Sequence, residues 1–141
     1  MKAAKSISQL LDSGDYLIDC NGAWLCPYVE DGATIVRIGG EIDACNADRV
    51  SENVFRYAAT ASGLVVDATA VDFCCVRGLR DLMTLDKHCH DSGIEWALVT
   101  SGSVRRTLEV TGMNNTLPLV DSVSTAVHSL TIATVGYLSG G

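Results

Sequence analysis

The sequence predicts an α/β domain with a mixed β-sheet: an antiparallel start, then parallel strands, with about four helices. Its first third holds β-favouring segments joined by tight turns, which is typical of antiparallel strands. The rest alternates short apolar runs with amphipathic segments, which is typical of parallel strands linked by helices. With 141 residues, 48% of them hydrophobic, the chain is long enough for one hydrophobic core.

The antiparallel start is predicted from two turns. Asn21-Gly22 separates the apolar segments 16–20 and 23–29, and Asn-Gly readily supplies the two positive φ angles of a type I′ hairpin turn. Glu30-Asp31-Gly32 marks the next turn, and the β-branched residues of 34–38 favour a third strand.

Helices and buried strands are predicted to alternate after residue 43. A first helix begins at Asn46 as its N-cap and ends before Ser62-Gly63, and further helices are expected at 76–90, 103–111 and after a cap at Asp121-Ser122. The consecutive apolar residues of the strand expected at 64–67 indicate that both faces of the sheet are covered. A second buried strand is expected at 96–99, and a short edge strand at 117–120.

The chain is predicted to have three parts. Residues 1–15 form an N-terminal appendage in which Ile7, Leu10 and Leu11 could share one face of a short helix. Residues 16–130 form the domain, and residues 131–141, which lack a clear period and end in Ser-Gly-Gly, are expected to be a flexible tail.

The composition narrows the classes of partner and the location. A net charge of −7 makes unaided binding to nucleic acid or to an anionic membrane a poor fit, because both rely on Lys and Arg. No apolar run reaches membrane-spanning length, and Asp12 and Asp15 interrupt any secretory signal. We therefore expect a cytoplasmic protein with a protein partner, in which the six cysteines are reduced and mostly buried.

Four segments, taken in order, resemble the STAS domain of the anti-sigma factor antagonist family. They are 39–43 (Gly-Gly-Glu-Ile-Asp), 64–68, 71–73 with Gly78-Leu79, and 96–99. The resemblance covers roughly residues 23 to 130 and lies in the order of the segments. It implies the STAS-like fold and a regulator that sequesters an anti-sigma factor, a kinase-like protein, and so releases a sigma factor for transcription.

The resemblance also locates a site after the strand at 64–67, in a loop that opens a helix. In such proteins the loop reads Asp-Ser-Ser-Gly or Asp-Ser-Thr-Gly, and the residue before the glycine is phosphorylated by the partner. The matching positions here are Cys75, Val76, Arg77 and Gly78. A guanidinium cannot accept a phosphoryl group, so we expect binding through the loop Cys74 to Gly78 and the following helix, without phosphorylation at the usual position.

Charged residues around this loop are further candidates for the site. Arg77 lies in a first helical turn, where the macrodipole disfavours a cation, and Asp81 four residues on could offset this through an ion pair. Arg77 either contacts an acidic group of the partner or is an exposed residue of a loop that has lost its role. Asp43 matches an acidic position near the family's partner-binding edge, whereas Asp67 is expected to be structural.

Adjacent Cys74 and Cys75 are candidate redox residues. Cys75 lies near a helix N-terminus and Arg77, which favour a thiolate, although burial is the alternative. No metal site is expected, because Cys75 and Cys89 would lie about 20 Å apart at the ends of one helix. The same separation argues against a Cys–His catalytic pair, so the sequence predicts no cofactor and no enzymatic activity.

A second interpretation stays open beside the antagonist. The domain could be a non-switching STAS scaffold or homodimer, or a redox or small-ligand sensor. If it is an antagonist, its control would come from abundance, from cysteine oxidation, or from phosphorylation elsewhere, for example on Ser6 or Ser8.

Overall fold

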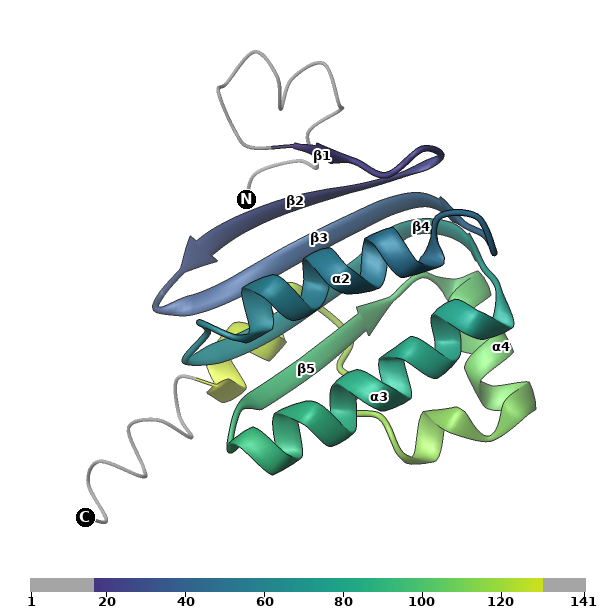
Figure 1. Ribbon diagram of the computed structural model, residues 1–141. Helices are drawn as coiled ribbons and strands as arrows, with labels where there is room; N and C mark the ends of the chain where they lie inside the picture. Colours follow the sequence, from purple (N-terminus) through teal and green to yellow (C-terminus); the bar gives the residue numbers. More distant parts are fainter. Residues whose placement is uncertain (1–16, 131–141) are drawn as a thin grey trace.

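A computed structural model describes residues 17–130, which form a five-stranded mixed sheet in the order β1-β2-β3-β4-β5 (Figure 1). The β1–β2 and β2–β3 pairs are antiparallel, and the β3–β4 and β4–β5 pairs are parallel, as predicted. The strands are β1 (Ile18–Asp19), β2 (Ala23–Glu30), β3 (Ala33–Ile42), β4 (Gly63–Cys74) and β5 (Glu95–Thr100). The predicted appendage 1–15 and tail 131–141 lie outside the described residues.

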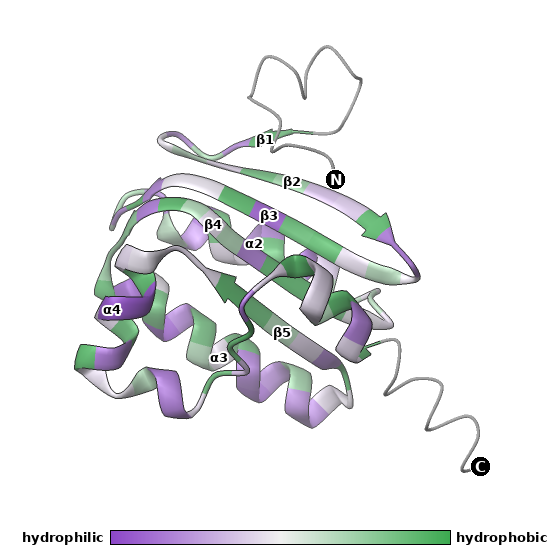
Figure 2. Cartoon of the chain, turned by 180° about the vertical axis from the view of Figure 1, so that it is seen from behind, coloured by the Kyte–Doolittle hydropathy of each residue, from purple (hydrophilic) through white to green (hydrophobic). Residues whose placement is uncertain are grey.

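The helices form layers on the two faces of this sheet. Helices α2 and α3 cover one face, and the helix at 123–130 packs on the other (Figures 1 and 2). Helix α4 follows β5, and a short 3-10 helix follows α4. The bounds are α2 (Ala47–Ala58), α3 (Val76–Ser92), α4 (Gly102–Thr111) and Met113–Asn115 for the 3-10 helix. The four predicted α-helices are confirmed.

Tight turns join the first three strands. Asn21 and Gly22 have φ angles of 61° and 102°, and Asp31 and Gly32 have φ angles of 50° and 82°. Positive φ at both central residues is the backbone form that matches the twist of the flanking strands. The Asn-Gly hairpin is therefore confirmed, although the described part of β1 has only two residues.

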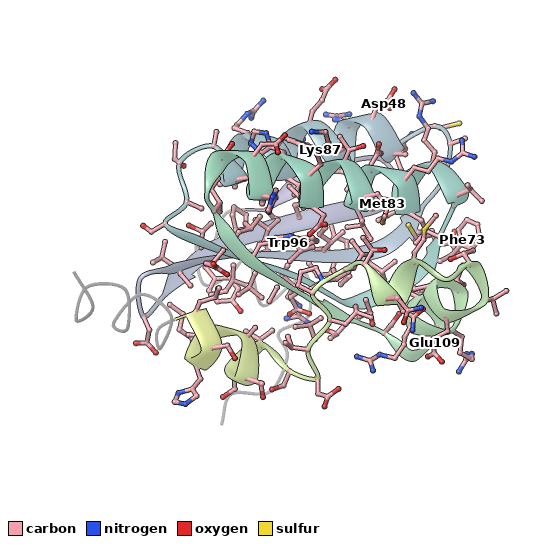
Figure 3. The ribbon with its side chains drawn as sticks, turned by 90° about the horizontal axis from the view of Figure 1, so that it is seen from below. Asp48, Phe73, Met83, Lys87, Trp96 and Glu109 are labelled. Carbon is pink, nitrogen blue, oxygen red and sulfur yellow. The ribbon has the colours of Figure 1, made fainter. Side chains whose placement is uncertain are left out.

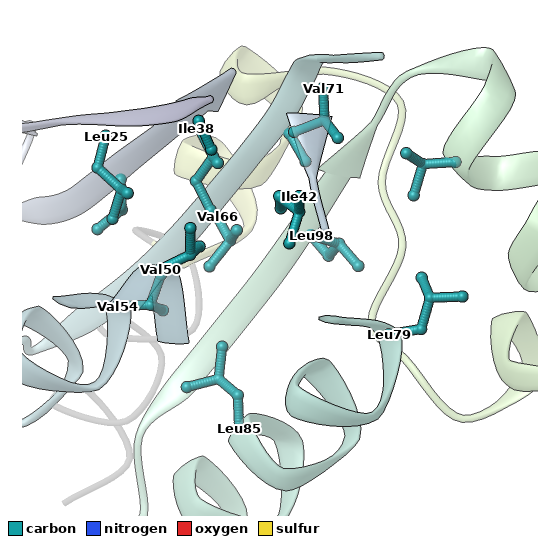
Figure 4. Packing of buried hydrophobic residues seen from close by; sticks show 14 of the residues in the cluster. Leu25, Ile38, Ile42, Val50, Val54, Val66, Val71, Leu79, Leu85 and Leu98 are labelled. Atoms are coloured by element: carbon teal, nitrogen blue, oxygen red, sulfur yellow. The ribbon is translucent and has the colours of Figure 1, made fainter. Parts of the chain in front are cut away.

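The hydrophobic core divides along the alternation of β4. Leu64 and Val66 face the layer formed by α2 and α3, whereas Val65 faces the helix at 123–130. Successive residues of a strand point to opposite faces of the sheet, and helices cover both faces, so all three side chains are fully buried. Figure 4 shows the larger cluster, in which Val50 of α2 and Leu85 of α3 pack toward the sheet.

Strand β4 is longer than the sequence predicted. It continues past Asp67 to Cys74, so residues 71–74 belong to the sheet rather than to a loop. The reason is that β3 also continues through Gly39-Gly40, which the sequence pattern left outside the strand. Register shifts after Arg37 and Gly40 let β3 keep pairing until Ile42 lies beside Cys74.

Asn46 occupies the N-cap position of α2, as predicted, but its side chain makes no capping hydrogen bond there. Its Oδ1 accepts a hydrogen bond from the Asp43 amide at 2.9 Å, and its Nδ2 donates to the carbonyls of Asn21 at 3.0 Å and Glu41 at 2.9 Å. The Asp43 carboxylate accepts from the amides of Cys45 and Asn46 before the helix. Asn46 is buried because it ties the β1–β2 turn to the end of β3.

Candidate functional site

The predicted loop is a short junction between β4 and α3. Only Cys75 separates the last strand residue, Cys74, from the first helical residue, Val76. The Cys75 amide donates to the Ile42 carbonyl at 2.9 Å, and its carbonyl accepts from the Leu79 amide at 3.1 Å. The structure thus brings residues 74–78 together as a strand end and a first helical turn, both held by backbone hydrogen bonds.

Gly78 is required by close packing beneath the junction. A Cβ atom at this position would lie 2.6 Å from Cys74 Sγ and 3.1 Å from Ile42 Cγ2. Both distances are shorter than ordinary carbon contacts of about 3.5–4.0 Å. The glycine that belongs to the predicted motif therefore lets α3 begin directly against β3 and β4.

Cys74 does not have the character of a reactive thiol. Burial raises the pKa of its thiol to about 12, and the nearby Cys75 and Asp81 add to the increase. Its Sγ donates a weak hydrogen bond to the Cys75 carbonyl at 3.6 Å. Because the thiolate is the reactive form, this raised pKa disfavours the predicted redox role of Cys74, which stays a prediction. Cys75 is half-buried, and its redox role stays a prediction.

Arg77 is paired within the chain, but not with the predicted residue. Its Nη2 lies 2.8 Å from both carboxylate oxygens of Asp48 on α2. The side chains are 56% and 62% exposed, so this pair contributes at most about 1 kcal/mol to stability. The pair nevertheless links the first turn of α3 to the first turn of α2.

Asp81, the predicted partner of Arg77, faces inward between α2 and α3. One of its carboxylate oxygens is buried and has no hydrogen-bond partner among the described residues. Burial raises the pKa of Asp81, the Asp48 carboxylate raises it further, and Arg77 opposes the shift. Asp81 borders a largely apolar cavity of about 50 Å³ that also reaches Gly78.

The N-terminus of α3 has no side-chain cap from residues 17–130. Cys75 occupies the N-cap position without a capping hydrogen bond, and the first turn holds no acidic residue. In α4, by contrast, Ser101 Oγ accepts from the Val104 amide at 3.3 Å. The first amides of α3 and its positive dipole end are therefore left for solvent or a partner.

A groove, here called the α3–α4 groove, opens beside this junction. Residues 72–76 and Leu79 line one side, and Ser103, Val104 and Thr107 of α4 line the other. Its volume is about 420 Å³. Phe73 lies at this end of the molecule close to α4, as Figure 3 shows, and is 52% exposed.

The sequence did not identify several of these features. Asp48, Phe73 and α4 were not among the predicted site residues, because their roles depend on contacts between distant segments. The phenylalanine next to the family motif was the one signal that the sequence offered. Asp67, expected to be structural, is buried and accepts hydrogen bonds from the amide and hydroxyl of Thr69.

Metal and membrane sites receive no support from the described part of the chain. Residues 17–130 contain no group of three or more His, Cys, Asp or Glu side chains placed to hold a metal ion. Within the same residues, no helix combines the length and apolar character needed to cross a membrane.

Comparison with known proteins agrees with the fold. The STAS domain model matches residues 27–126, so the chain belongs to the STAS domain family. It is 33% identical to Osmosensory protein A of Mycobacterium tuberculosis over 121 residues, which cover 83% of this chain and 77% of that protein. It is 30% identical to the anti-sigma-F factor antagonist RsfB of the same species over 99 residues, covering 69% and 80%.

A solved structure shows the same architecture. The crystal structure of an anti-sigma factor antagonist from Mycobacterium paratuberculosis aligns with a TM-score of 0.70 and 24% identity, covering 81% of this chain and 98% of that one. This structure supports the fold. The family match and the antagonist relative at 30% identity place the chain among regulatory binding domains similar to anti-sigma factor antagonists, rather than among enzymes.

Proposed function

We propose that this protein is an antagonist that binds an anti-sigma factor, or a related kinase-like protein, through residues 74–78 and the exposed face of α3. The observation that carries the proposal is the β4–α3 junction, which is fixed by backbone hydrogen bonds but leaves Val76 and Arg77 exposed. A preorganised surface of this kind loses little entropy on binding. By occupying the anti-sigma factor in the cytoplasm, the protein would release a sigma factor for transcription.

Binding would proceed without phosphorylation at the usual position. Arg77 occupies that position and offers no hydroxyl group, and the Asp48 carboxylate fixes its charge in place. Arg77 would contact an acidic group of the partner through the guanidinium nitrogens that Asp48 leaves free. Asp43 and Asp81 would support this surface indirectly, because Asp43 caps the turn before α2 and Asp81 faces inward.

Control would then come from elsewhere. It would come from the amount of protein, from cysteine oxidation such as that of Cys75, or from phosphorylation elsewhere, for example on Ser6 or Ser8. Both serines lie outside the described residues.

The test is a binding measurement with purified kinase-type anti-sigma factors from the native organism. We expect wild type to bind at least one of them and to remain unphosphorylated at residue 77 after incubation with ATP. Arg77→Glu should weaken binding at least about thirtyfold, which corresponds to the loss of about 2 kcal/mol or more expected for a central interface arginine. Unchanged affinity of the Glu variant for every candidate would reject this interface.

A variant that rebuilds the family loop separates a changed control mechanism from a lost one. Arg77→Ser combined with Cys75→Asp restores a hydroxyl before Gly78 and an acidic N-cap. If an anti-sigma kinase captured by wild type phosphorylates this double variant, the chain is an antagonist whose control has changed. If neither protein captures an anti-sigma kinase, a scaffold or a sensor becomes the leading interpretation.

The Arg77–Asp48 pair favours one alternative, a non-switching STAS scaffold or homodimer. An arginine neutralised within its own chain needs no partner carboxylate, so the surface could serve a constitutive contact. Sedimentation of the purified protein distinguishes the two forms of this alternative. A concentration-dependent dimer that the Arg77→Glu variant abolishes would place the contact between two copies of this chain.

A further inference from the structure

The α3–α4 groove has apolar walls although it is open to solvent. Phe73 and Val76 are 52% and 56% exposed at its rim, and Leu79 and Val104 are buried at its base. Exposed large apolar side chains that converge on one concavity are a common mark of a docking surface. The groove borders the proposed partner site, but one of its walls is α4, which the proposed function does not involve.

Hydrogen bonds hold the two walls at a fixed separation. Ser101 Oγ donates to the Val71 carbonyl at 2.8 Å, and Ser103 Oγ donates to the Asp72 carbonyl at 3.3 Å. Both serines belong to the start of α4, and both carbonyls belong to the last residues of β4. The groove is therefore part of the folded structure and does not have to form upon binding.

The charge of the groove is set by one residue. Asp72 is the only charged side chain in its lining, and its carboxylate has no hydrogen bond or ion pair among residues 17–130. It also lies in a chain whose net charge is −7. A cationic group on a binding partner would be complementary to both the local and the overall charge.

From these observations we propose that the α3–α4 groove receives a large apolar side chain of the protein partner, flanked by a lysine or arginine that pairs with Asp72. This inference rests on the proposed function for the existence of a partner, and it adds α4 to the interface. It also states the chemistry of the partner segment: an apolar anchor beside a basic residue. In this arrangement Phe73 and Val76 bury the anchor while Arg77 contacts a separate part of the partner.

A large side chain introduced into the groove provides the first test. Thr107 lines the groove and is exposed, so Thr107→Trp should fill the space without disturbing the core. Thr125→Trp is the matched control, because Thr125 is also an exposed helical threonine but lies in the helix on the opposite face of the sheet. We expect Thr107→Trp to weaken binding of the anti-sigma factor at least about tenfold and Thr125→Trp to leave it unchanged. Equal affinities for the two variants would overturn the proposal.

Charge reversal provides the second test. Asp72→Lys should weaken binding, whereas Glu30→Lys makes the same charge change at the far end of the sheet, where β2 turns into β3. A loss of affinity confined to Asp72→Lys supports the pairing with a basic residue. Tighter binding by Asp72→Lys would show that the partner segment is acidic and would refute this part of the inference.

A peptide experiment tests the groove without any anti-sigma factor, so its failure is distinct from failure of the proposed function. Two peptides are titrated into the isotope-labelled wild-type chain: one has phenylalanine flanked by lysines, and the other has phenylalanine flanked by glutamates. We expect the lysine peptide to shift the amide resonances of residues 72–76 and 103–107, with a tenfold or greater preference over the glutamate peptide. Shifts elsewhere, no shifts, or equal shifts with both peptides would contradict the inference.

Discussion

Gly78→Ala offers a direct test of how the junction is packed. In an exposed helix this change stabilises by about 1 kcal/mol, because alanine has a higher helix propensity than glycine. Here the new methyl group would lie 2.6 Å from Cys74 Sγ and 3.1 Å from Ile42 Cγ2. Overpacking of this kind costs about 1–3 kcal/mol. Subtracting the propensity gain of about 1 kcal/mol leaves a net cost of about 0–2 kcal/mol, and because both residues crowd the methyl group we expect a value in the upper half of this range.

Urea unfolding of wild type and two glycine variants measures this effect. Gly102→Ala is the matched control: it also lies in a first helical turn, and its new methyl group would meet only Arg106 Nη1 at 3.8 Å. Gly102→Ala should be neutral or stabilising, whereas Gly78→Ala should be destabilising. Adding Cys74→Ala removes the sulfur, so the double variant should be more stable than the sum of the single effects by about 1 kcal/mol. A Gly78→Ala variant as stable as wild type would refute the packing explanation.

Three further predictions concern the same region. Cys75→Asp should raise the free energy of unfolding by about 0.5–2 kcal/mol in urea titrations, because it supplies the missing N-cap of α3; an unchanged midpoint would contradict this. Asp81→Asn should stabilise the fold near neutral pH. Because the pKa of Asp81 is raised above its ordinary value of 3.8, the native state binds the carboxyl proton more tightly than the unfolded state does. The wild type therefore loses stability as the pH rises from 3.8 through the raised native pKa. Its advantage over wild type should vanish in unfolding curves at pH 3, and an advantage that is independent of pH would exclude this cause. A double-mutant cycle of Arg77→Ala and Asp48→Ala should give a coupling below about 1 kcal/mol that salt reduces, and a larger, salt-insensitive value would mean that the pair is buried in solution.

Local patterns in the sequence determine much of the fold. The Asn-Gly turn, the uninterrupted apolar strand at 64–67 and the spacing of apolar residues in the helices each report a nearby physical preference, and their elements are found where predicted. The sequence did not predict the extension of β4, because this extension depends on distant contacts rather than on a local preference. Gly39-Gly40 resembles a turn in the sequence, but both residues remain in β3 because the strand passes close to the hairpin turn and to Trp24. Such a close approach depends on segments far apart in the chain.

The candidate site shows the same difference between features set by local sequence and features set by tertiary contacts. The motif positions 75–78 were found because the segments of the family occur in order, and the structure explains the glycine among them. The partner of Arg77 could not be found from helical spacing, because Asp48 comes from another helix and lies 29 residues away in the sequence. Asp81 was available at the right spacing, but its side chain is directed between α2 and α3. Spacing along one helix thus gave candidate pairs, whereas tertiary packing selected the actual pair.

The most direct measurement of the central claim is the affinity of the wild-type protein for a native kinase-type anti-sigma factor before and after incubation with ATP, with intact mass recorded in parallel. We predict tight binding that ATP does not weaken and no phosphate at residue 77. Binding that is lost as the chain gains a phosphate would show that the antagonist switches through another residue. Failure to bind any such anti-sigma factor would contradict the assignment of this surface as an antagonist interface.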